Sequence, residues 1–198
     1  MSTPRDRAAV PGPVRADARR NRELLLAAAL AAFTEAGADD TSLEEIARRA
    51  GVGIGTLYRH FPGRQALLEA VYTDQVAALC RQASDLLAAG SPGAALATWL
   101  RAMVEFGATK RTLTAALTAD YGKNTPVFSA SRDDLLAAAT ALLTRAQQAG
   151  AVRPEVQPMD LLRLTHAVAV AVERAGDGQD QAGRLLSLML DGLLVPAS

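Results

Sequence analysis

Residues 41–68 read TSLEEIARRAGVGIGTLYRHFPGRQALL, and this stretch decides the fold. Apolar residues repeat in it at the three- and four-residue spacing of one helix face, at Leu43, Ile46, Ala47 and Ala50. Thr41 and Glu44 have the S/T-x-x-E spacing of a capping box at the start of this helix, and Gly51 interrupts the helix at its end. A short helix follows over residues 53–60. Two helices joined by a tight glycine-containing turn predict a helix-turn-helix, a motif that presents its second helix to the DNA major groove.

The apolar periodicity predicts more helices on both sides of this motif. The first covers about residues 17–36, ends at Gly37 and buries the face formed by Leu26, Ala29, Leu30 and Phe33. Later helices are expected over 64–90, from 92 onward, over 109–119, between the loop 121–126 and Gly150, over 158–175 and over 179–194. The predicted fold class is all-α with about nine helices: a three-helix helix-turn-helix domain followed by a larger helical domain.

The composition agrees with helices and excludes several kinds of chemistry. The chain has 49% apolar residues but only 4% aromatic residues, which favours helices packed through alanine and leucine. A single cysteine, Cys80, and two histidines exclude a disulfide framework and a cysteine-cluster metal site, so we expect neither a metal nor another cofactor. There is no Ser-His-Asp grouping, phosphate-binding loop or HExxH motif, so we do not expect an enzyme.

The positive charge is local although the formal net charge is +0. Residues 1–22 carry six arginines against two aspartates, and residues 41–64 carry four arginines against two glutamates. Such basic segments suit a DNA partner. We expect a disordered arm over residues 1–16, the helix-turn-helix domain over 17–63 and a second helical domain over 64–198.

One segment is similar in layout to a secretion signal. Three arginines, Arg19, Arg20 and Arg22, precede an apolar run over residues 24–33. Glu23 abuts the run, and ten residues fall short of the about 20 needed to cross a bilayer. We therefore interpret the run as a buried helix and expect a cytoplasmic protein without membrane contact.

The motif closely resembles the N-terminal domain of the TetR (tetracycline-repressor) family of bacterial regulators. TSLEEIA at 41–47 and GVGIGTLYRHFPGRQALL at 51–68 are similar to the family pattern T-x-x-x-I-A-x-x-A-G-V-S-x-G-T-L-Y-x-H-F-x-x-K-x-x-L. The resemblance covers about residues 20–75. Gly53 replaces the usual serine, Arg64 the usual lysine, and Ile54 stands where a polar base reader is common. The resemblance implies a homodimeric repressor that binds a palindromic operator and leaves it when a small molecule enters the C-terminal domain.

The same resemblance assigns DNA contacts to the helix-turn-helix. Thr56 suits a base edge or thymine methyl, and Tyr58 and His60 suit phosphates, while Leu57 and Phe61 alternate with them as buried anchors. The two hydroxyl residues before the first helix of the motif are expected to offer backbone N–H groups to a phosphate. The full set of expected DNA-binding residues is Thr41, Ser42, Gly53, Ile54, Gly55, Thr56, Tyr58, Arg59, His60 and Arg64.

The C-terminal domain is expected to hold a ligand cavity and a dimer interface. The candidate cavity residues, each of which is also compatible with plain core packing, are Trp99, Met103, Phe106, Tyr121, Phe128 and His166. The last two helices carry more apolar surface than one core face requires, at Leu161, Leu162, Val168, Val172, Leu185, Leu186, Leu188, Met189 and Leu193. We expect these two helices to form the homodimer. The alternatives are an interaction module with a vestigial helix-turn-helix and an all-helical enzyme.

Overall fold

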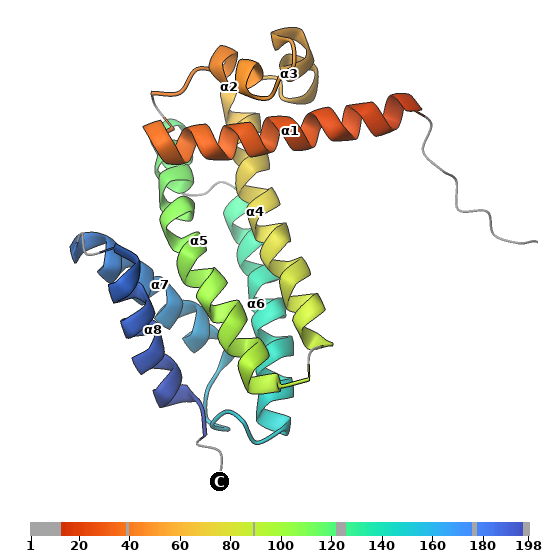
Figure 1. Cartoon of the computed structure of the whole chain (residues 1–198). Helices are drawn as coiled ribbons and strands as arrows, with labels where there is room; N and C mark the ends of the chain where they lie inside the picture. Colours follow the sequence, from red (N-terminus) through yellow and green to blue (C-terminus); the bar gives the residue numbers. More distant parts are fainter. Residues whose placement is uncertain (1–12, 39, 89, 122–125, 176–177, 196–198) are drawn as a thin grey trace, which may run out of the picture. The chain divides into compact units, whose positions relative to one another are not determined.

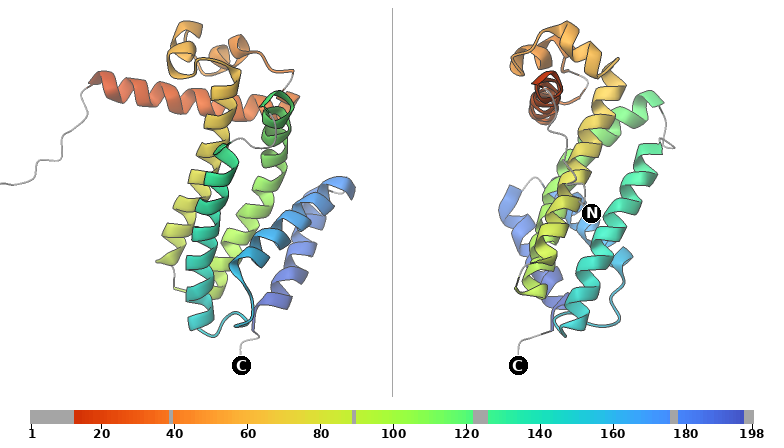
Figure 2. Two further views of the ribbon diagram at one scale, coloured as in Figure 1. Left: turned by 180° about the vertical axis from the view of Figure 1, so that it is seen from behind. Right: turned by 90° about the vertical axis from the view of Figure 1, so that its right-hand side faces the viewer.

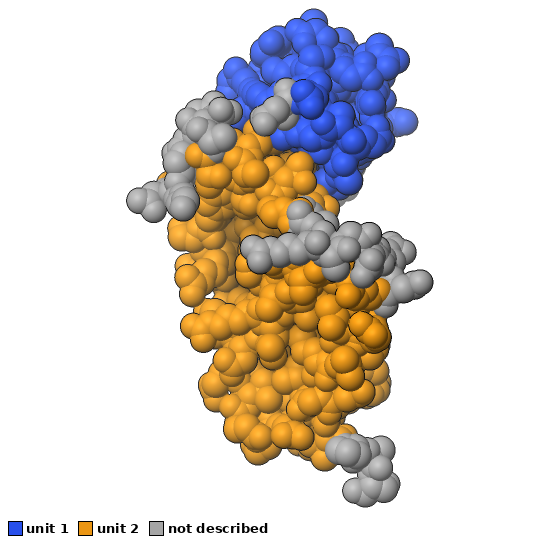
Figure 3. Space-filling model, turned by 90° about the vertical axis from the view of Figure 1, so that its left-hand side faces the viewer, with its two compact units in different colours: residues 1–67 blue, residues 68–198 orange. Residues whose placement is uncertain are grey.

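The computed structural model describes residues 13–38, 40–88, 90–121, 126–175 and 178–195. Helices dominate these ranges, so the all-α prediction is confirmed. The chain divides into two compact units, residues 1–67 and residues 68–198 (Figure 3). The helices are α1 (Pro13–Ala36), α2 (Leu43–Arg49), α3 (Ile54–His60), α4 (Arg64–Leu87), α5 (Pro92–Tyr121), α6 (Pro126–Gln148), α7 (Pro158–Ala175) and α8 (Gly178–Leu193).

Helix α1 is longer than expected at its N-terminus. It begins at Pro13, so assigning residues 13–16 to a disordered arm was wrong. Proline suits the first helical position because its missing N–H has no partner in the first turn of a helix. Residues 1–12 of the expected arm lie outside the described residues. Leu26, Ala29 and Phe33 are buried as predicted, whereas Leu30 is only half-buried.

The helix-turn-helix is formed by α2 and α3. Gly51, between them, has φ of +68°, a backbone conformation that favours glycine, and the Val52 amide donates to the Ala47 carbonyl at 3.0 Å. Ile46 from α2 and Leu57 from α3 are fully buried, with α1 packed against both helices. The tight turn and these two anchors hold α3 across α2 and α1.

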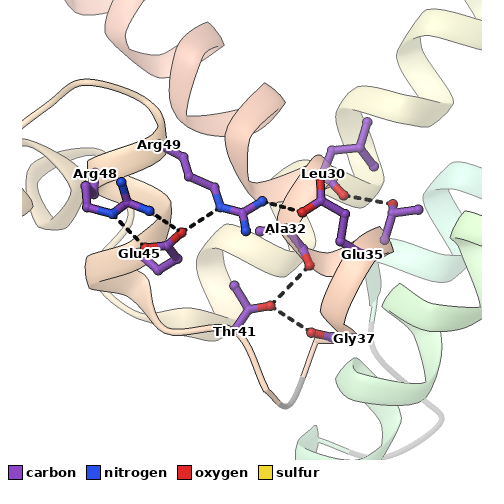
Figure 4. A network of polar contacts seen from close by, with 9 residues as sticks. Leu30, Ala32, Glu35, Gly37, Thr41, Glu45, Arg48 and Arg49 are labelled. Atoms are coloured by element: carbon purple, nitrogen blue, oxygen red, sulfur yellow. Dashed lines mark hydrogen bonds and ion pairs between the residues drawn. The ribbon is translucent and has the colours of Figure 1, made fainter.

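The cap of α2 differs from the expected Thr41–Glu44 capping box by one residue. Ser42 is the N-cap, and its Oγ accepts from the Glu45 amide at 3.1 Å. Thr41 is only 5% exposed; its hydroxyl donates to the Gly37 carbonyl at 2.8 Å and lies 3.2 Å from the Ala32 carbonyl oxygen (Figure 4). Thr41 therefore ties the chain before α2 to the end of α1.

The second unit contains most of α4 and all of α5 to α8. The long helices α5 and α6 pack together (Figures 1 and 2). Helices α7 and α8 pack on each other, and α7 also packs on both α5 and α6. The expectation of two separate helices, one from residue 92 onward and one over 109–119, was wrong, because α5 is continuous over 30 residues. Gly107 lies inside α5 opposite Ala169 of α7, so this glycine permits close helix packing and does not break the helix.

Candidate functional sites: the exposed face of α3 and a cavity between α4 and α7

Helix α3 buries Leu57 and leaves its other residues exposed or half-buried. Tyr58 is 48% exposed and Ile54, Gly55 and Arg59 are also exposed, as is the preceding residue Gly53, whereas Leu57 is fully buried. Thr56 and His60 are half-buried. We call Gly53, Ile54, Gly55, Thr56, Tyr58, Arg59 and His60 the α3 face. All seven belong to the predicted DNA-contact set.

The Arg59 guanidinium lies along its own helix. Its Nη2 donates to the Thr56 hydroxyl oxygen at 2.9 Å, and its Nε donates to the Gly55 carbonyl at 3.3 Å. An arginine has five N–H donors, so Arg59 keeps donors for a phosphate. The Thr56 hydroxyl, as the acceptor in this bond, keeps its own proton to donate.

Two residues of the expected DNA-contact set also have structural roles. Arg64 is half-buried: its Nη1 donates to the Thr41 carbonyl, and its guanidinium lies over the Phe33 ring at 5.8 Å. The Thr41 side chain is buried, so the expected contact of Thr41 with a phosphate would be made by its backbone N–H. Arg64 therefore fastens the start of α4 to the connection between α1 and α2, a role that no local sequence pattern signals.

The basic residues of α2 are neutralised by glutamates. Arg48 and Arg49 form ion pairs with Glu45 at 2.7 and 2.8 Å, and Arg49 also reaches Glu35 of α1 at 2.6 Å (Figure 4). The hydrogen bonds from Arg48 and then Arg49 lower the pKa of Glu45 from 4.5 to about 2. The charge excess that the sequence places over residues 41–64 is therefore weaker than the residue count indicates.

A cavity of about 580 Å³ lies in the second unit. Its wall comes from α4, α5, α6 and α7. The volume of the cavity is within the usual range for small-molecule sites. Four predicted cavity residues line it: Met103, Phe106, Phe128 and His166. Phe106 and Phe128 both contact the ring of Tyr72, at centroid distances of 6.1 and 5.4 Å.

The two other predicted cavity residues are not part of this wall as described. Trp99 is fully buried, and its indole Nε1 donates to the Leu79 carbonyl of α4 at 3.0 Å, so it is a core residue that joins α5 to α4. The side chain of Tyr121 lies outside the described residues. Sequence reasoning missed the polar lining residues other than His166, among them Tyr72, Lys110, Arg132 and Arg163, which come from four different helices.

A second, shallower hollow lies on α7 and α8. Its wall is apolar or glycine throughout and consists of Leu164, Ala167, Val168, Ala171, Leu185, Leu188, Met189, Gly192 and Leu193. Leu188 is 63% exposed and Leu164 39% exposed, whereas Leu186 is 4% exposed and belongs to the core. Helix α7 thus contributes one face to the cavity and another to this α7–α8 groove.

Two kinds of site are missing from the described ranges. They contain no group of three or more histidine, cysteine, aspartate or glutamate side chains placed to hold a metal ion. Nor does any helix within them have the length and apolar content needed to cross a membrane.

Comparison with known proteins assigns both units. Residues 25–71 match the family model of bacterial regulatory proteins of the tetR family, and residues 91–195 match the model of the SbtR-like transcriptional regulator C-terminal domain. The crystal structure of TetR transcriptional regulator SCO0520 from Streptomyces coelicolor is 40% identical, with a TM-score of 0.77, covering 89% of this chain and 99% of that one. A TetR regulator from Mycobacterium vanbaalenii is 37% identical, with a TM-score of 0.77, covering 92% and 100%.

Two curated relatives match this chain over a short stretch. The HTH-type transcriptional regulators TtgW and SrpR of Pseudomonas putida are each 43% identical over 56 residues, which is 28% of this chain. The matched part spans 42% of TtgW and 26% of SrpR. With one family model covering more than half of the chain and a solved relative aligned over nearly its whole length, the chain belongs to the tetR family of bacterial transcriptional regulators.

Proposed function

We propose that the protein is a DNA-binding transcriptional repressor that acts as a homodimer on a palindromic operator and dissociates when a small molecule occupies the cavity. The observation that carries the proposal is the α3 face, where Tyr58 is 48% exposed beside the buried anchor Leu57. An exposed tyrosine and arginine on a short helix held by buried neighbours suit insertion into a major groove.

The α3 face combines the two kinds of contact that DNA recognition requires. Tyr58, Arg59 and His60 supply donors for phosphates, which position the protein on the duplex. Ile54 is 37% exposed and Thr56 keeps a free hydroxyl proton, so these two side chains suit a thymine methyl and a base edge. Gly53 and Gly55 have nothing within 4 Å of their missing Cβ atoms and allow close approach of the backbone to the duplex.

The test of DNA binding is a gel shift at one fixed salt concentration with the DNA upstream of the protein's own gene. Tyr58→Phe and His60→Ala should each weaken binding by about 1–3 kcal/mol, the usual worth of a hydrogen bond to a charged group. The matched controls are Tyr72→Phe and His166→Ala, which make the same chemical changes in the cavity wall. Equal affinity for DNA in all four variants would remove Tyr58 and His60 from the contacts.

The α7–α8 groove is proposed as the homodimer interface. Exposed Leu164 and Leu188 form an apolar surface of the kind that a second copy of the chain covers. Leu188→Glu should give a folded monomer that loses operator affinity, because a single half-site provides too few contacts. Leu186→Glu, in contrast, should unfold the second unit, since Leu186 is buried. Sedimentation of the wild type as a monomer at micromolar concentration would refute the interface.

Release from DNA requires the ligand to distinguish two conformers. A ligand with equal affinity for both conformers does not change their populations. A tenfold preference for the released conformer corresponds to a coupling free energy of about 1.4 kcal/mol between ligand and DNA. Helix α4 is the proposed connection, because it begins at Arg64 and carries Tyr72 in the cavity wall. Reciprocity requires operator DNA to weaken ligand binding by the same factor. Equal ligand affinity of free and operator-bound protein would refute the switch.

A further inference from the structure

The charged side chains that line the cavity all have one sign. Lys110 comes from α5, Arg132 from α6 and Arg163 from α7, and His166 adds an imidazole. The wall, as far as the structure describes it, contains no aspartate or glutamate. Three helices therefore bring cations to one small volume without supplying an anion.

These cations lack carboxylate partners among the described residues. Lys110 has neither a hydrogen bond nor an ion pair there, and burial lowers the pKa of its ammonium group. The described contact of Arg132 is a 3.8 Å approach of Nη2 to the Sδ of Met159, a weak acceptor. Lys110 is half-buried, whereas Arg132 and Arg163 are exposed. The unpaired charge of Lys110 in a partly desolvated position costs stability, and such an arrangement is typical of binding sites.

Apart from Tyr72, the other residues of the wall are apolar, glycine or threonine. Phe106 and Phe128 flank Tyr72, whose hydroxyl has no hydrogen-bond partner in the described structure. The cavity threonines use their protons within their own helices: Thr118 donates to the Thr114 carbonyl at 2.7 Å, and Thr165 to the Leu161 carbonyl at 2.8 Å. The donors left for a ligand are thus the cations, the imidazole and the Tyr72 phenol.

We propose that the effector is an amphipathic anion, with an apolar body against Phe106 and Phe128 and a carboxylate or phosphate among Lys110, Arg132 and Arg163. The inference rests on the proposed function in taking the cavity as the effector site. An anion forms charge-assisted hydrogen bonds with these groups. A neutral ligand leaves the cations unpaired, and a cationic ligand is repelled.

Substitution of Lys110 is a specific test of the proposal, because the stability of the ligand-free protein and its affinity for an anion should not fall together. Lys110→Met removes a partly desolvated, unpaired charge and keeps the side-chain length, so the ligand-free variant should unfold at the same or a higher temperature. Its affinity for an anion should nevertheless fall at least tenfold. A lysine that served only the packing of α5 would produce a loss of stability instead.

The experiment measures the binding of four probes to the full chain by calorimetry. Each probe is used below the concentration at which it aggregates. Decanoate, decyl phosphate, 1-decanol and decyltrimethylammonium share one alkyl chain and differ in the charge of the head group. At least one of the two anions should bind ten times or more as tightly as 1-decanol, and decyltrimethylammonium should bind more weakly than both anions. Comparison of the two anions identifies the head group.

Variants assign the preference to the cavity. Lys110→Met and Arg132→Gln should each reduce the preference for the anion, while Arg101→Gln, the same loss of charge at an exposed position of α5 outside the cavity wall, should leave it unchanged. The proposal is overturned if 1-decanol or decyltrimethylammonium binds as tightly as both anions, or if Lys110→Met and Arg132→Gln keep the full preference.

A gel shift on the same samples separates this inference from the proposed function. Anion preference without DNA binding would refute the repressor and leave the ligand class standing. Operator binding without anion preference would refute the ligand class alone.

Discussion

A close approach of α5 and α7 at Gly107 offers a quantitative test of the second unit. A Cβ atom built on Gly107 would lie 2.3 Å from the Cβ of Ala169 and 3.8 Å from its Cα. Non-bonded carbon atoms pack at about 3.5–4.0 Å. Neither Cβ can rotate away, so Gly107→Ala must push the two helices apart locally by more than about 1 Å.

The expected free-energy change combines two opposing effects. Alanine in place of glycine inside a helix stabilises by about 1 kcal/mol. Overpacking costs about 1–3 kcal/mol, and a clash between two immobile atoms belongs at the upper end of that range. Gly107→Ala should therefore destabilise the protein by about 2 kcal/mol, the difference between these values.

Ala169→Gly is the compensating change. Alone it should cost about 1 kcal/mol through helix propensity, but in the double variant it removes the clash. The double variant should then be close to the wild type in stability, which corresponds to a coupling of about 3 kcal/mol between the two positions.

The assay is urea unfolding of the four proteins, followed by helix content. Gly183→Ala is the control, because Gly183 lies in α8, is exposed and has nothing within 4 Å of its missing Cβ; it should stabilise by up to about 1 kcal/mol. Free energies of Gly107→Ala and Ala169→Gly that add within about 0.5 kcal/mol in the double variant would refute the close approach of α5 and α7.

Three further changes test the first unit and Cys80. Thr41→Val should cost about 1–3 kcal/mol in thermal unfolding, because it removes the donor to the Gly37 carbonyl; an unchanged midpoint would contradict this role. Since the pKa of Glu45 falls from 4.5 to about 2 on folding, its contribution to stability is complete above pH 4.5 and is lost between about 4.5 and 2. Glu45→Gln should flatten the acid dependence of urea unfolding in that window, by a small amount because the site is exposed; parallel curves would refute it. Burial raises the pKa of the Cys80 thiol, so iodoacetamide at pH 8 should alkylate it more slowly than free cysteine, and equal rates would contradict the burial.

The sequence predicts the helix-turn-helix well because its signals are local. The stripe through Ile46, the turn at Gly51 and the anchor Leu57 lie within a dozen residues, so periodicity and turn chemistry suffice. The errors in the prediction occur where a contact with a residue distant in the sequence determines the local structure. Thr41 and Ser42 both carry hydroxyls suited to a helix cap, and only the packing of Thr41 on the end of α1 selects Ser42 as the cap.

The cavity was accessible to sequence reasoning only in its apolar part. Large apolar residues such as Phe106 and Phe128 are natural candidates for a ligand wall, although Trp99 met the same criterion and is core. Lys110, Arg132 and Arg163 lie on three separate helices and have ordinary surface-like neighbours in the sequence. Their convergence depends on tertiary packing, including the close approach of Gly107 to Ala169.

The two faces of α7 have a consequence for the divergence of such regulators. Residues 162, 163, 165 and 166 line the cavity, while residues 164, 167, 168 and 171 line the α7–α8 groove. Substitutions on α7 that alter ligand choice therefore fall next to residues of the proposed subunit contact, whereas those at Lys110 on α5 or Arg132 on α6 do not. Duplicated genes should accordingly acquire new effectors through α5 and α6 while still pairing with their parent, and should escape that cross-pairing through changes in α7 and α8. Biosensor libraries built on this chain should diversify the two sets of helices separately.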